Sequence, residues 1–338
     1  MKYGVFDHMD NGGQPLWEQY ESRLRLIEAY DSSGFHAFHL AEHHATPLGM
    51  APSPAVFLAA VAQRTKQLRF GPLVYILTLQ SPLRAYEEIC MLDQMSGGRL
   101  ELGMGKGISP IELAYFGADP ARAQSIYQEA SAIIMKAFSQ KRLTHHGEHF
   151  HFDDVPIELA PVQLPHPPLW LGMGNPDHTR HAALNKINMV CNGTTSQVRV
   201  MTDRYREEWS KAGGAPQDIP FLGVNRHIVV ADTDAQAYRI AKPAYETWYA
   251  NFSKLWREKG QTPPGAGYPP EFDDLIRRSF CILGSPQTVR DMVADQIEKN
   301  GINYLLCRLA FGSLSHEQSA RSIELFAEQV MPRVKRAA

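Results

Sequence analysis

Short apolar runs alternate with longer amphipathic stretches along almost the whole chain. The apolar runs have the length and residue types of buried strands. They predict strands at 2–7, 35–41, 68–75, 99–104, 168–173, 187–191, 221–230 and 302–308. The amphipathic stretches predict helices at 15–33, 53–65, 81–96, 122–138, 177–185, 196–212, 234–250, 286–300 and 316–335. Eight strands, each followed by a helix, favour parallel βα units closed into a barrel, with a doubly wound open sheet as the alternative.

Glycine and proline mark the expected ends of these helices. Gly34 and Gly301 stand where helices should stop, and Pro286 stands at a first helical position. No linker divides the chain, so we expect a single α/β domain over residues 1–338, a (β/α)8 TIM barrel with insertions. One insertion is expected at 139–167, between the fourth helix and the fifth strand.

The stretch 257–273 is rich in proline and glycine, which rules out a long regular element there. Long irregular loops in barrels are often functional lids. We predict a mobile lid at 257–273, with a surface excursion of no function as the alternative.

The composition excludes several classes of protein. Hydrophobic residues make up 44% of the chain and charged residues 21%, with a net charge of −2. The charges are interspersed, which argues against a nucleic-acid or membrane-surface binder. No apolar run approaches the length of a membrane span, and no signal segment is evident, so a cytoplasmic protein is expected. The four cysteines are widely spaced without a CxxC pair, which predicts buried free thiols.

The candidate catalytic residues are those that come directly after the predicted strands, because barrel active sites form at the carboxyl ends of the strands. His8 follows the first strand, and Glu42, His43 and His44 follow the second. Adjacent residues on a strand point to opposite faces, so His43 and His44 should not bind one metal ion. A single catalytic or ligand-contacting imidazole is the preferred interpretation.

The sequence Leu-Gly-Met-Gly occurs at 102–105 and again at 171–174, each time at a strand end. Glycine lets a backbone approach a ligand closely, and Lys106 adds a positive charge. The two copies therefore suggest a phosphate cradle across adjacent loops, although tight strand-to-helix turns also require glycine. Neither copy matches a dinucleotide or P-loop motif.

Four histidines stand close together at His145, His146, His149 and His151, in a segment that predicts a small hairpin. Their spacing fixes no ligand geometry, so we expect no metal site there.

Several longer motifs resemble the bacterial luciferase-like family of flavin-dependent monooxygenases. The most specific are Ala-Glu-His-His at 41–44 and Leu-Asp-Gln-Met-Ser-Gly-Gly-Arg at 92–99. Further similar segments are 81–84, 147–150, 165–170, 284–286 and 330–332. The resemblance therefore covers nearly the whole chain.

This resemblance implies a barrel that binds reduced FMN, commonly supplied by a separate flavin reductase. The reduced flavin reacts with O2 to give a C4a-(hydro)peroxide, which oxygenates a small organic substrate. An F420-dependent oxidoreductase on the same barrel is the alternative, and a non-catalytic flavin-binding protein is a third interpretation. The substrate is not indicated by the sequence. Side chains that could line an apolar pocket, or belong to the core, are Phe6, Tyr75, Met104 and Trp248.

The resemblance also implies roles for individual cofactor-binding residues. Lys106, next to Gly105, falls where luciferases place a phosphate-binding arginine. Gly174, Asn175 and His178 align with the family's second phosphate-binding turn. Glycine replaces a carboxylate at 174 and histidine replaces a hydroxyl residue at 178, so only the backbone role carries over directly.

The remaining implied residues surround the flavin ring. His43 matches the histidine linked to activity, with His8 as the next candidate. Glu42 would orient the loop or contact the flavin. A non-proline cis peptide is implied at Leu73–Val74, behind the isoalloxazine ring.

The resemblance finally implies a homodimer joined through the predicted helices 53–65 and 81–96. Ordinary packing of these helices on the barrel is the alternative.

Overall fold

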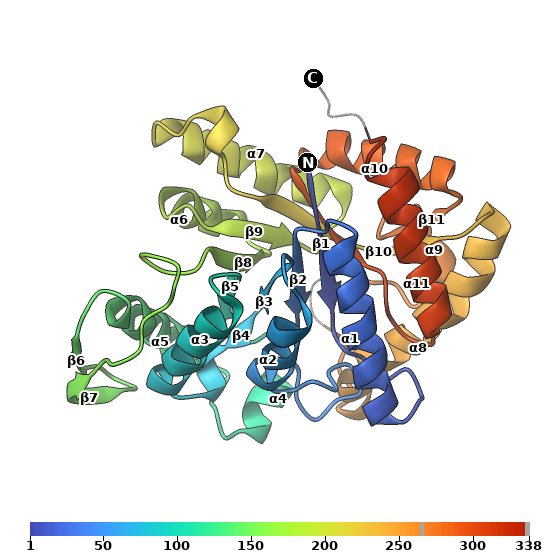
Figure 1. Ribbon diagram of the computed structural model, residues 1–338. Coiled ribbons are helices and arrows are strands. Elements are labelled where there is room, and N and C mark those ends of the chain that lie inside the picture. Colours follow the sequence, from blue (N-terminus) through green and yellow to red (C-terminus); the bar gives the residue numbers. More distant parts are fainter. Residues whose placement is uncertain (264–266, 335–338) are drawn as a thin grey trace.

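Nine parallel strands form a nearly closed barrel in the computed structural model, which describes residues 1–263 and 267–334 (Figure 1). The strands in chain order are β1 (Lys2–Asp7), β2 (Ala37–Leu40), β3 (Arg69–Pro72), β4 (Tyr75–Ile76), β5 (Leu102–Gly105), β8 (Leu169–Met173), β9 (Asn188–Cys191), β10 (Leu222–Val230) and β12 (Tyr304–Arg308). Their hydrogen-bonded order is β3-β2-β1-β12-β10-β9-β8-β5-β4. A bridge between Phe70 and Leu100 brings the two ends of this order together. The predicted (β/α)8 barrel is therefore confirmed.

Each of the eight predicted strands overlaps an observed one, with two differences. The third predicted strand is divided, because Leu73 and Val74 interrupt the pairing between β3 and β4. An additional strand, β11 (Cys281–Gly284), pairs with the distal end of β10 and was not predicted. Its four residues are buried and too few to show a periodic pattern.

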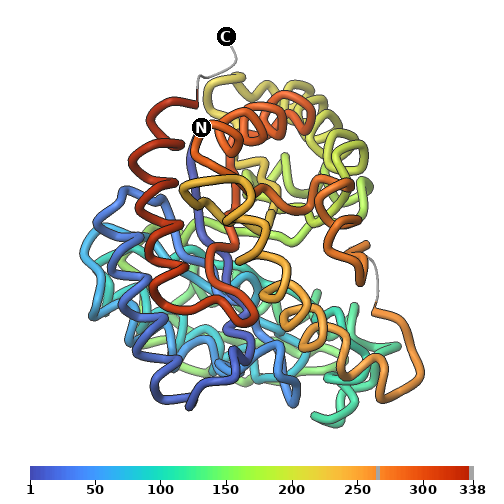
Figure 2. Tube along the Cα trace, turned by 90° about the vertical axis from the view of Figure 1, so that its right-hand side faces the viewer, coloured from blue at the N-terminus to red at the C-terminus, as the bar shows by residue number. Residues whose placement is uncertain are grey.

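Helices surround the barrel, and Figure 2 shows α11 beside α1, where the ring of helices closes. The predicted helices correspond to α1 (Leu16–Ser32), α2 (Pro54–Arg64), α3 (Pro82–Ser96), α5 (Ala123–Ala137), α6 (Thr179–Leu184), α7 (Thr195–Lys211), α8 (Asp234–Glu258), α10 (Pro286–Asn300) and α11 (His316–Leu325). The Ser285 hydroxyl caps α10, and Gly301 ends that helix with a φ of 61°. Ser285 and Gly301 therefore act as the start and stop signals of this helix that their residue types predict.

Four helices differ from the prediction. Helix α8 continues eight residues beyond the predicted end at 250. The short helices α4 (Pro110–Tyr115) and α9 (Phe272–Arg277) were not predicted. Helix α11 ends before a π-helical turn, Phe326–Val330, rather than near 335.

The two predicted interruptions have different structures. Segment 139–167 contains an antiparallel hairpin of β6 (Arg142–His146) and β7 (His151–Pro156) on the flank of the barrel (Figure 1). In segment 257–273, the described residues between α8 and α9 (259–263 and 267–271) are irregular, and residues 264–266 lie outside the described residues. Its mobility stays a prediction.

Large side chains close the amino-terminal end of the barrel. Tyr304 and Trp170 are fully buried in its interior, where the Tyr304 hydroxyl lies 3.1 Å from Nε2 of His39. Gly4 is required beside them, because a Cβ atom there would lie 1.8 Å from the Tyr304 hydroxyl oxygen. Burial lowers the pKa of His39 to about 3, so this ring is neutral. The interior is therefore open to ligands only at the carboxyl ends of the strands.

All four cysteines are buried free thiols, as predicted. Among the described residues, no helix is both long and apolar enough to cross a membrane.

Candidate active site

The two histidines that follow β2 contact different carboxylates. Nδ1 of His43 lies 3.1 Å from a carboxylate oxygen of Glu112. Nε2 of His44 lies 2.9 Å from the Glu42 carboxylate instead. The two histidines therefore contact different carboxylates, and the expectation that they do not bind one metal ion stays a prediction.

Glu112 orients the His43 ring and was missed by sequence reasoning. Its other carboxylate oxygen accepts the backbone N–H of His44 at 2.8 Å. Burial alone would raise the pKa of Glu112, but hydrogen bonds from His43 and His44 offset this effect and hold the pKa below its usual value. Because an ionised carboxylate can only accept a hydrogen bond, Nδ1 of His43 carries the proton in its contact with Glu112.

Helix α4 places Glu112 at this position. The Ser109 hydroxyl accepts the N–H of Glu112, and Pro110 is the first helical residue. Serine followed three residues later by glutamate is a known signal for a helix start. That signal was available in the sequence and would have indicated α4.

Glu42 fixes the backbone beside the divided third strand. Its carboxylate accepts the N–H of Ile76 at 2.9 Å, in addition to the contact with His44. The peptide bond between Leu73 and Val74 is cis, as the resemblance implied. Glu42 therefore orients this loop, whereas direct contact between Glu42 and a flavin stays a prediction.

The first Leu-Gly-Met-Gly copy makes room for this segment. A Cβ atom at Gly103 would lie 2.4 Å from the carbonyl oxygen of Pro72. At Gly105 it would lie 2.5 Å from a methyl group of Val74. These two glycines are therefore needed for packing between β5 and the third strand.

The second copy faces open space. Gly172 and Gly174 are exposed, and no atom lies within 4 Å of a Cβ atom built on either. They share a face of β8 with Trp170, whose side chain is buried inside the barrel. The backbone of β8 is therefore uncovered at these two glycines.

The predicted phosphate residues lie on neighbouring strand ends. Strands β5 and β8 pair directly, so the loop containing Lys106 adjoins the turn 174–178. Lys106 is exposed and forms no ion pair with any described residue. The Asn175 side chain accepts the N–H of Asp177 at 3.0 Å, and His178 is exposed. This basic, open surface suits a phosphate, and its binding role stays a prediction.

The opposite side of the mouth carries a basic cluster that sequence reasoning largely missed. Arg308 ends β12, and its Nη1 donates to Nε2 of His227 on β10 at 2.8 Å. The ring of His8, which follows β1, lies 5.5 Å from the ring of His43. Burial and the nearby Arg308 guanidinium hold the pKa values of His8 and His227 well below the usual range. Alternation along β10 and β12 could have placed His227 and Arg308 inside the barrel.

The carboxyl-terminal half of α8 covers the mouth. Trp248 is fully buried against His227, with ring centroids 4.6 Å apart. Leu255 and Trp256 pack on Ile111 of α4, and Figure 2 shows the end of α8 beside that segment. A cavity of about 30 Å³ remains, lined by His43, Thr46, Leu48, Ile108, Ser109, Glu112, Phe252, Leu255 and Trp256. This volume holds little more than one water molecule, so this cavity is too small for an organic substrate in the arrangement described.

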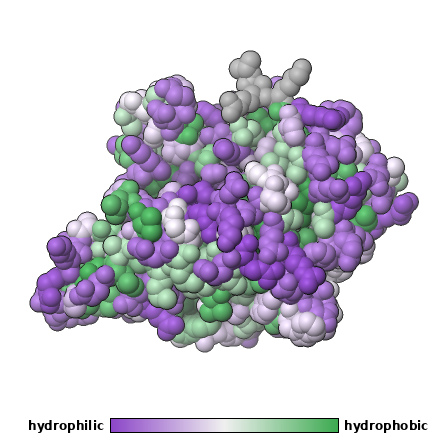
Figure 3. All heavy atoms as spheres, in the orientation of Figure 1, coloured by the Kyte–Doolittle hydropathy of each residue, from purple (hydrophilic) through white to green (hydrophobic). Residues whose placement is uncertain are grey.

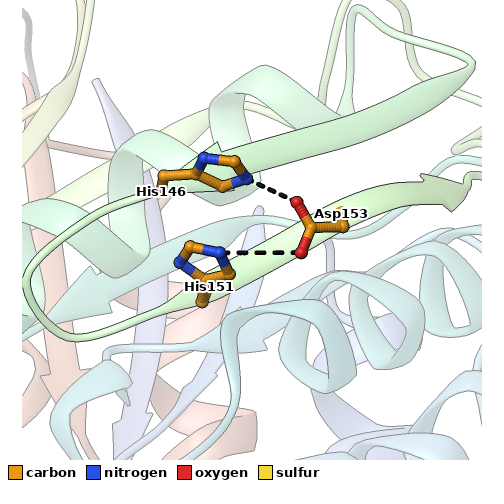
Figure 4. A group of neighbouring side chains, drawn as sticks. All are labelled: His146, His151 and Asp153. Atoms are coloured by element: carbon orange, nitrogen blue, oxygen red, sulfur yellow. Dashed lines mark hydrogen bonds and ion pairs between the residues drawn. The ribbon is translucent and has the colours of Figure 1, made fainter.

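A second polar group lies on the flank of the barrel. His146, His151 and Asp153 approach one another on the β6–β7 hairpin (Figure 4), with their potential ligand atoms within 4.8 Å. The two imidazoles stack 4.0 Å apart, and all three residues are exposed. His145 and His149 turn instead towards Glu129 and Ser125 of α5. His146 and His151 thus both lie within ion-pair distance of the exposed Asp153. The expectation that this group binds no metal stays a prediction.

Two relatives match the chain over almost its full length. The uncharacterized protein y4wF of Sinorhizobium fredii is 46% identical over 334 residues, covering 99% of this chain and 97% of the relative. The oxygenase component of the flavin-dependent trigonelline monooxygenase of Acinetobacter baylyi is 25% identical, with 98% and 95% covered. A family model described as luciferase-like monooxygenase matches residues 1–304.

Solved structures show the same fold. The monooxygenase RslO1 from Streptomyces bottropensis superposes with a TM-score of 0.88 at 24% identity, covering 99% of this chain and all of that one. The oxygenating constituent of 3,6-diketocamphane monooxygenase from Pseudomonas putida, in complex with FMN, has a TM-score of 0.81 at 22% identity, with 100% and 99% covered. The coenzyme F420-dependent tetrahydromethanopterin reductase of Methanopyrus kandleri has a TM-score of 0.72 at 17% identity, with 99% of each chain covered.

Proposed function

This chain belongs to the luciferase-like monooxygenase family, and we propose that it uses reduced FMN and O2 to oxygenate a small organic substrate. The observation that carries the proposal is the open, glycine-lined face of β8 across the mouth from His43 and Glu112. Relatives named as flavin-dependent monooxygenases support it. When bound, reduced FMN supplies the electrons that activate O2. A separate flavin reductase would provide it, in line with the relative named as an oxygenase component.

His43 is the proposed catalytic residue. Glu112 would hold its Nδ1 proton and leave Nε2 for proton exchange, and His43 lines the small cavity together with α8 residues. A neutral imidazole in this position accepts a proton, and an imidazolium donates one. The α8 side chains Phe252, which is partly buried, and Trp256, which is buried, would shield the same cavity from bulk water.

The flavin itself is proposed to lie against the third strand. Its ring would face the backbone of Leu73 and Val74, which Glu42 holds in place through Ile76. Its phosphate would lie beyond the ends of β5 and β8, at Lys106 and the turn 174–178.

The choice between FMN and F420 can be made by titration. We expect the purified protein to bind anaerobically reduced FMN, and to consume O2 once FMN reduction is sustained by a reductase and NADH. Binding of reduced F420 without binding of FMN, together with no O2 consumption, would identify a hydride-transferring enzyme and overturn the proposal.

The phosphate assignment predicts the effect of Lys106→Ala. A charge-assisted contact contributes roughly 1.5–3 kcal/mol, so reduced FMN should bind roughly tenfold more weakly or worse. Riboflavin, which lacks the phosphate, should bind nearly as before. The matched control is Lys66→Ala, since Lys66 is also exposed but precedes β3 at the other end of the barrel. Equal losses for FMN and riboflavin would exclude Lys106 from this role.

We also propose that α2 and α3 join two subunits. Val56, Met91 and Met95 are exposed by 74%, 53% and 43%, so these side chains do not pack on the barrel. Figure 3 shows apolar residues on the part of the surface that covers α2 and α3. Exposed apolar patches of this kind often mark interfaces.

The dimer is testable by light scattering at micromolar concentration. A mass twice that of the 338-residue chain is expected, and Met91→Glu should shift it towards the monomer by placing a charge in the interface. Arg84→Glu on the same helix, at an already charged and exposed position, is the control for a general effect of charge. A monomeric wild-type protein contradicts the proposal.

A further inference from the structure

Arg308 carries a buried positive charge with no acidic partner. Arg308 is only 1% exposed. Of its side-chain nitrogens, only Nη1 forms a hydrogen bond, which it donates to the neutral His227 ring. Its Nε and Nη2 have no hydrogen-bond partner among the residues that the structure describes. Throughout residues 1–263 and 267–334, no carboxylate lies within ion-pair distance of it. A buried charge left uncompensated is costly, so such a group requires an explanation beyond stability.

Two other buried arginines show which contacts a guanidinium makes elsewhere in this barrel. Arg23 is 4% exposed, and its Nε lies 3.0 Å from a carboxylate oxygen of Asp7. Arg226, on the other face of β10, donates to the Gln296 side chain and to the Asn225 carbonyl oxygen. Arg23 thus has a carboxylate partner, and Arg226 has two oxygen acceptors although its Nη2 is unpartnered among the described residues. Arg308 has neither a carboxylate partner nor an oxygen acceptor among those residues.

The groups around Arg308 offer donors and aromatic faces. Its guanidinium carbon lies 4.8 Å from the Trp248 ring centre, 5.7 Å from that of Tyr268 and 5.4 Å from that of Phe6. Trp248 Nε1, the Tyr268 hydroxyl and His8 Nδ1 are buried without hydrogen-bond partners. The cluster therefore combines a positive charge with several unused polar atoms and lacks an anionic acceptor.

We propose that Arg308 binds the carboxylate, or an equivalent anionic oxygen group, of the organic substrate. A guanidinium presents two parallel N–H groups to a carboxylate, and Nε and Nη2 are the two that are free here. The proposal deepens the proposed function, on which it rests, by assigning a substrate class to the same mouth.

The position of Arg308 suits a substrate that reacts near His43. Around the barrel, β12 is four strand positions from β5, so Arg308 lies across the mouth from the proposed flavin phosphate. His8 lies between Arg308 and His43, with its ring 5.5 Å from that of His43 and 5.8 Å from that of Trp248. A molecule anchored at Arg308 would thus extend past His8 towards His43 and the flavin side.

The test uses benzoate as the probe and benzamide as a neutral molecule of nearly the same shape. Calorimetric titration of the flavin-free wild-type protein should show benzoate bound roughly tenfold more tightly than benzamide or better. Arg308→Met should abolish this preference, and Arg321→Met, at an exposed arginine of α11, should keep it. Equal or undetectable binding of both probes by the wild-type protein overturns the proposal, as does a preference that survives Arg308→Met.

The melting temperature of Arg308→Met gives a second readout. If Arg308 served only to stabilise the fold, its replacement would lower the melting temperature. Methionine can occupy the apolar surroundings without a buried charge, so Arg308→Met should melt at the same temperature as the wild type or higher. A lower melting temperature overturns the proposal.

Titration with reduced FMN distinguishes the substrate from the flavin as the source of the anion. A tenfold loss of FMN affinity in Arg308→Met, with the benzoate preference unchanged, would assign the charge to the flavin ring and overturn the substrate assignment. A wild-type protein that binds benzoate but no flavin would instead contradict the proposed function alone.

Discussion

Replacing His43 with alanine is expected to cut product formation by about 10²–10⁴, the usual range for a lost general acid or base. The affinity for FMN should stay within a few-fold of the wild-type value, because the proposed flavin contacts lie on the third strand, β5 and β8. The measurement couples a flavin reductase and NADH to the protein and quantifies product by mass spectrometry. O2 consumption should continue with release of hydrogen peroxide, since O2 still meets the reduced flavin.

Glu112→Gln separates the orientation of His43 from its chemistry. The amide keeps the size of Glu112 but removes the negative charge that holds the Nδ1 proton. A smaller loss than for His43→Ala is expected, together with a shift in the pH profile of product formation, because the charge stabilises the imidazolium form. A pH profile identical to that of the wild type would remove Glu112 from this positioning role.

Wild-type product yield in His43→Ala would disprove the assignment, and sequence reasoning named His8 as the next candidate. The structure makes His8 a weaker general base, because burial and Arg308 hold its pKa well below the usual range. His44 is bonded to Glu42 and packs 4.6 Å from the Phe116 ring, which agrees with a structural role. Of the three histidines at the mouth, His43 alone combines an ionised partner with access to the cavity.

The strands could be predicted because each one is recognisable from the residue types of a short, continuous segment of the sequence. Buried parallel strands are near-continuous apolar runs, and each predicted run overlaps an observed strand. The position of the site followed from the same source, since the ends of the strands in a barrel meet at one mouth. Helix α4 was missed because it has only six residues, although Ser109 and Glu112 carry a start signal.

The contacts within the site could not be predicted in the same way. His43 and Glu112 are 69 positions apart, and His227 and Arg308 are 81 positions apart. No periodicity links such residues, because their meeting depends on the register of strands that close the barrel. The resemblance supplied His43 and the Leu73–Val74 cis peptide, but it did not indicate Arg308.

The two Leu-Gly-Met-Gly copies illustrate the same limit, because identical tetrapeptides have different surroundings. Sequence reasoning treated both as parts of one phosphate cradle. In the structure, the first copy packs against Pro72 and Val74, and the second faces open space. Gly103→Ala should therefore lower the melting temperature, since its Cβ atom would lie 2.4 Å from a backbone oxygen that cannot easily move.

Gly172→Leu is expected to weaken FMN binding while leaving the fold intact, in contrast to Gly103→Ala, which should destabilise the fold. The leucine side chain has room in the flavin-free protein, because no atom lies within 4 Å of its Cβ position. That room is the space proposed for the flavin ring, so binding must displace the side chain or distort the site. Overpacking costs about 1–3 kcal/mol, which corresponds to a loss of roughly tenfold to a hundredfold in affinity. Riboflavin should lose as much as FMN, unlike in Lys106→Ala, because the obstruction acts on the ring. Unchanged affinity for both ligands in a well-folded Gly172→Leu protein would mean that the flavin lies elsewhere in the mouth.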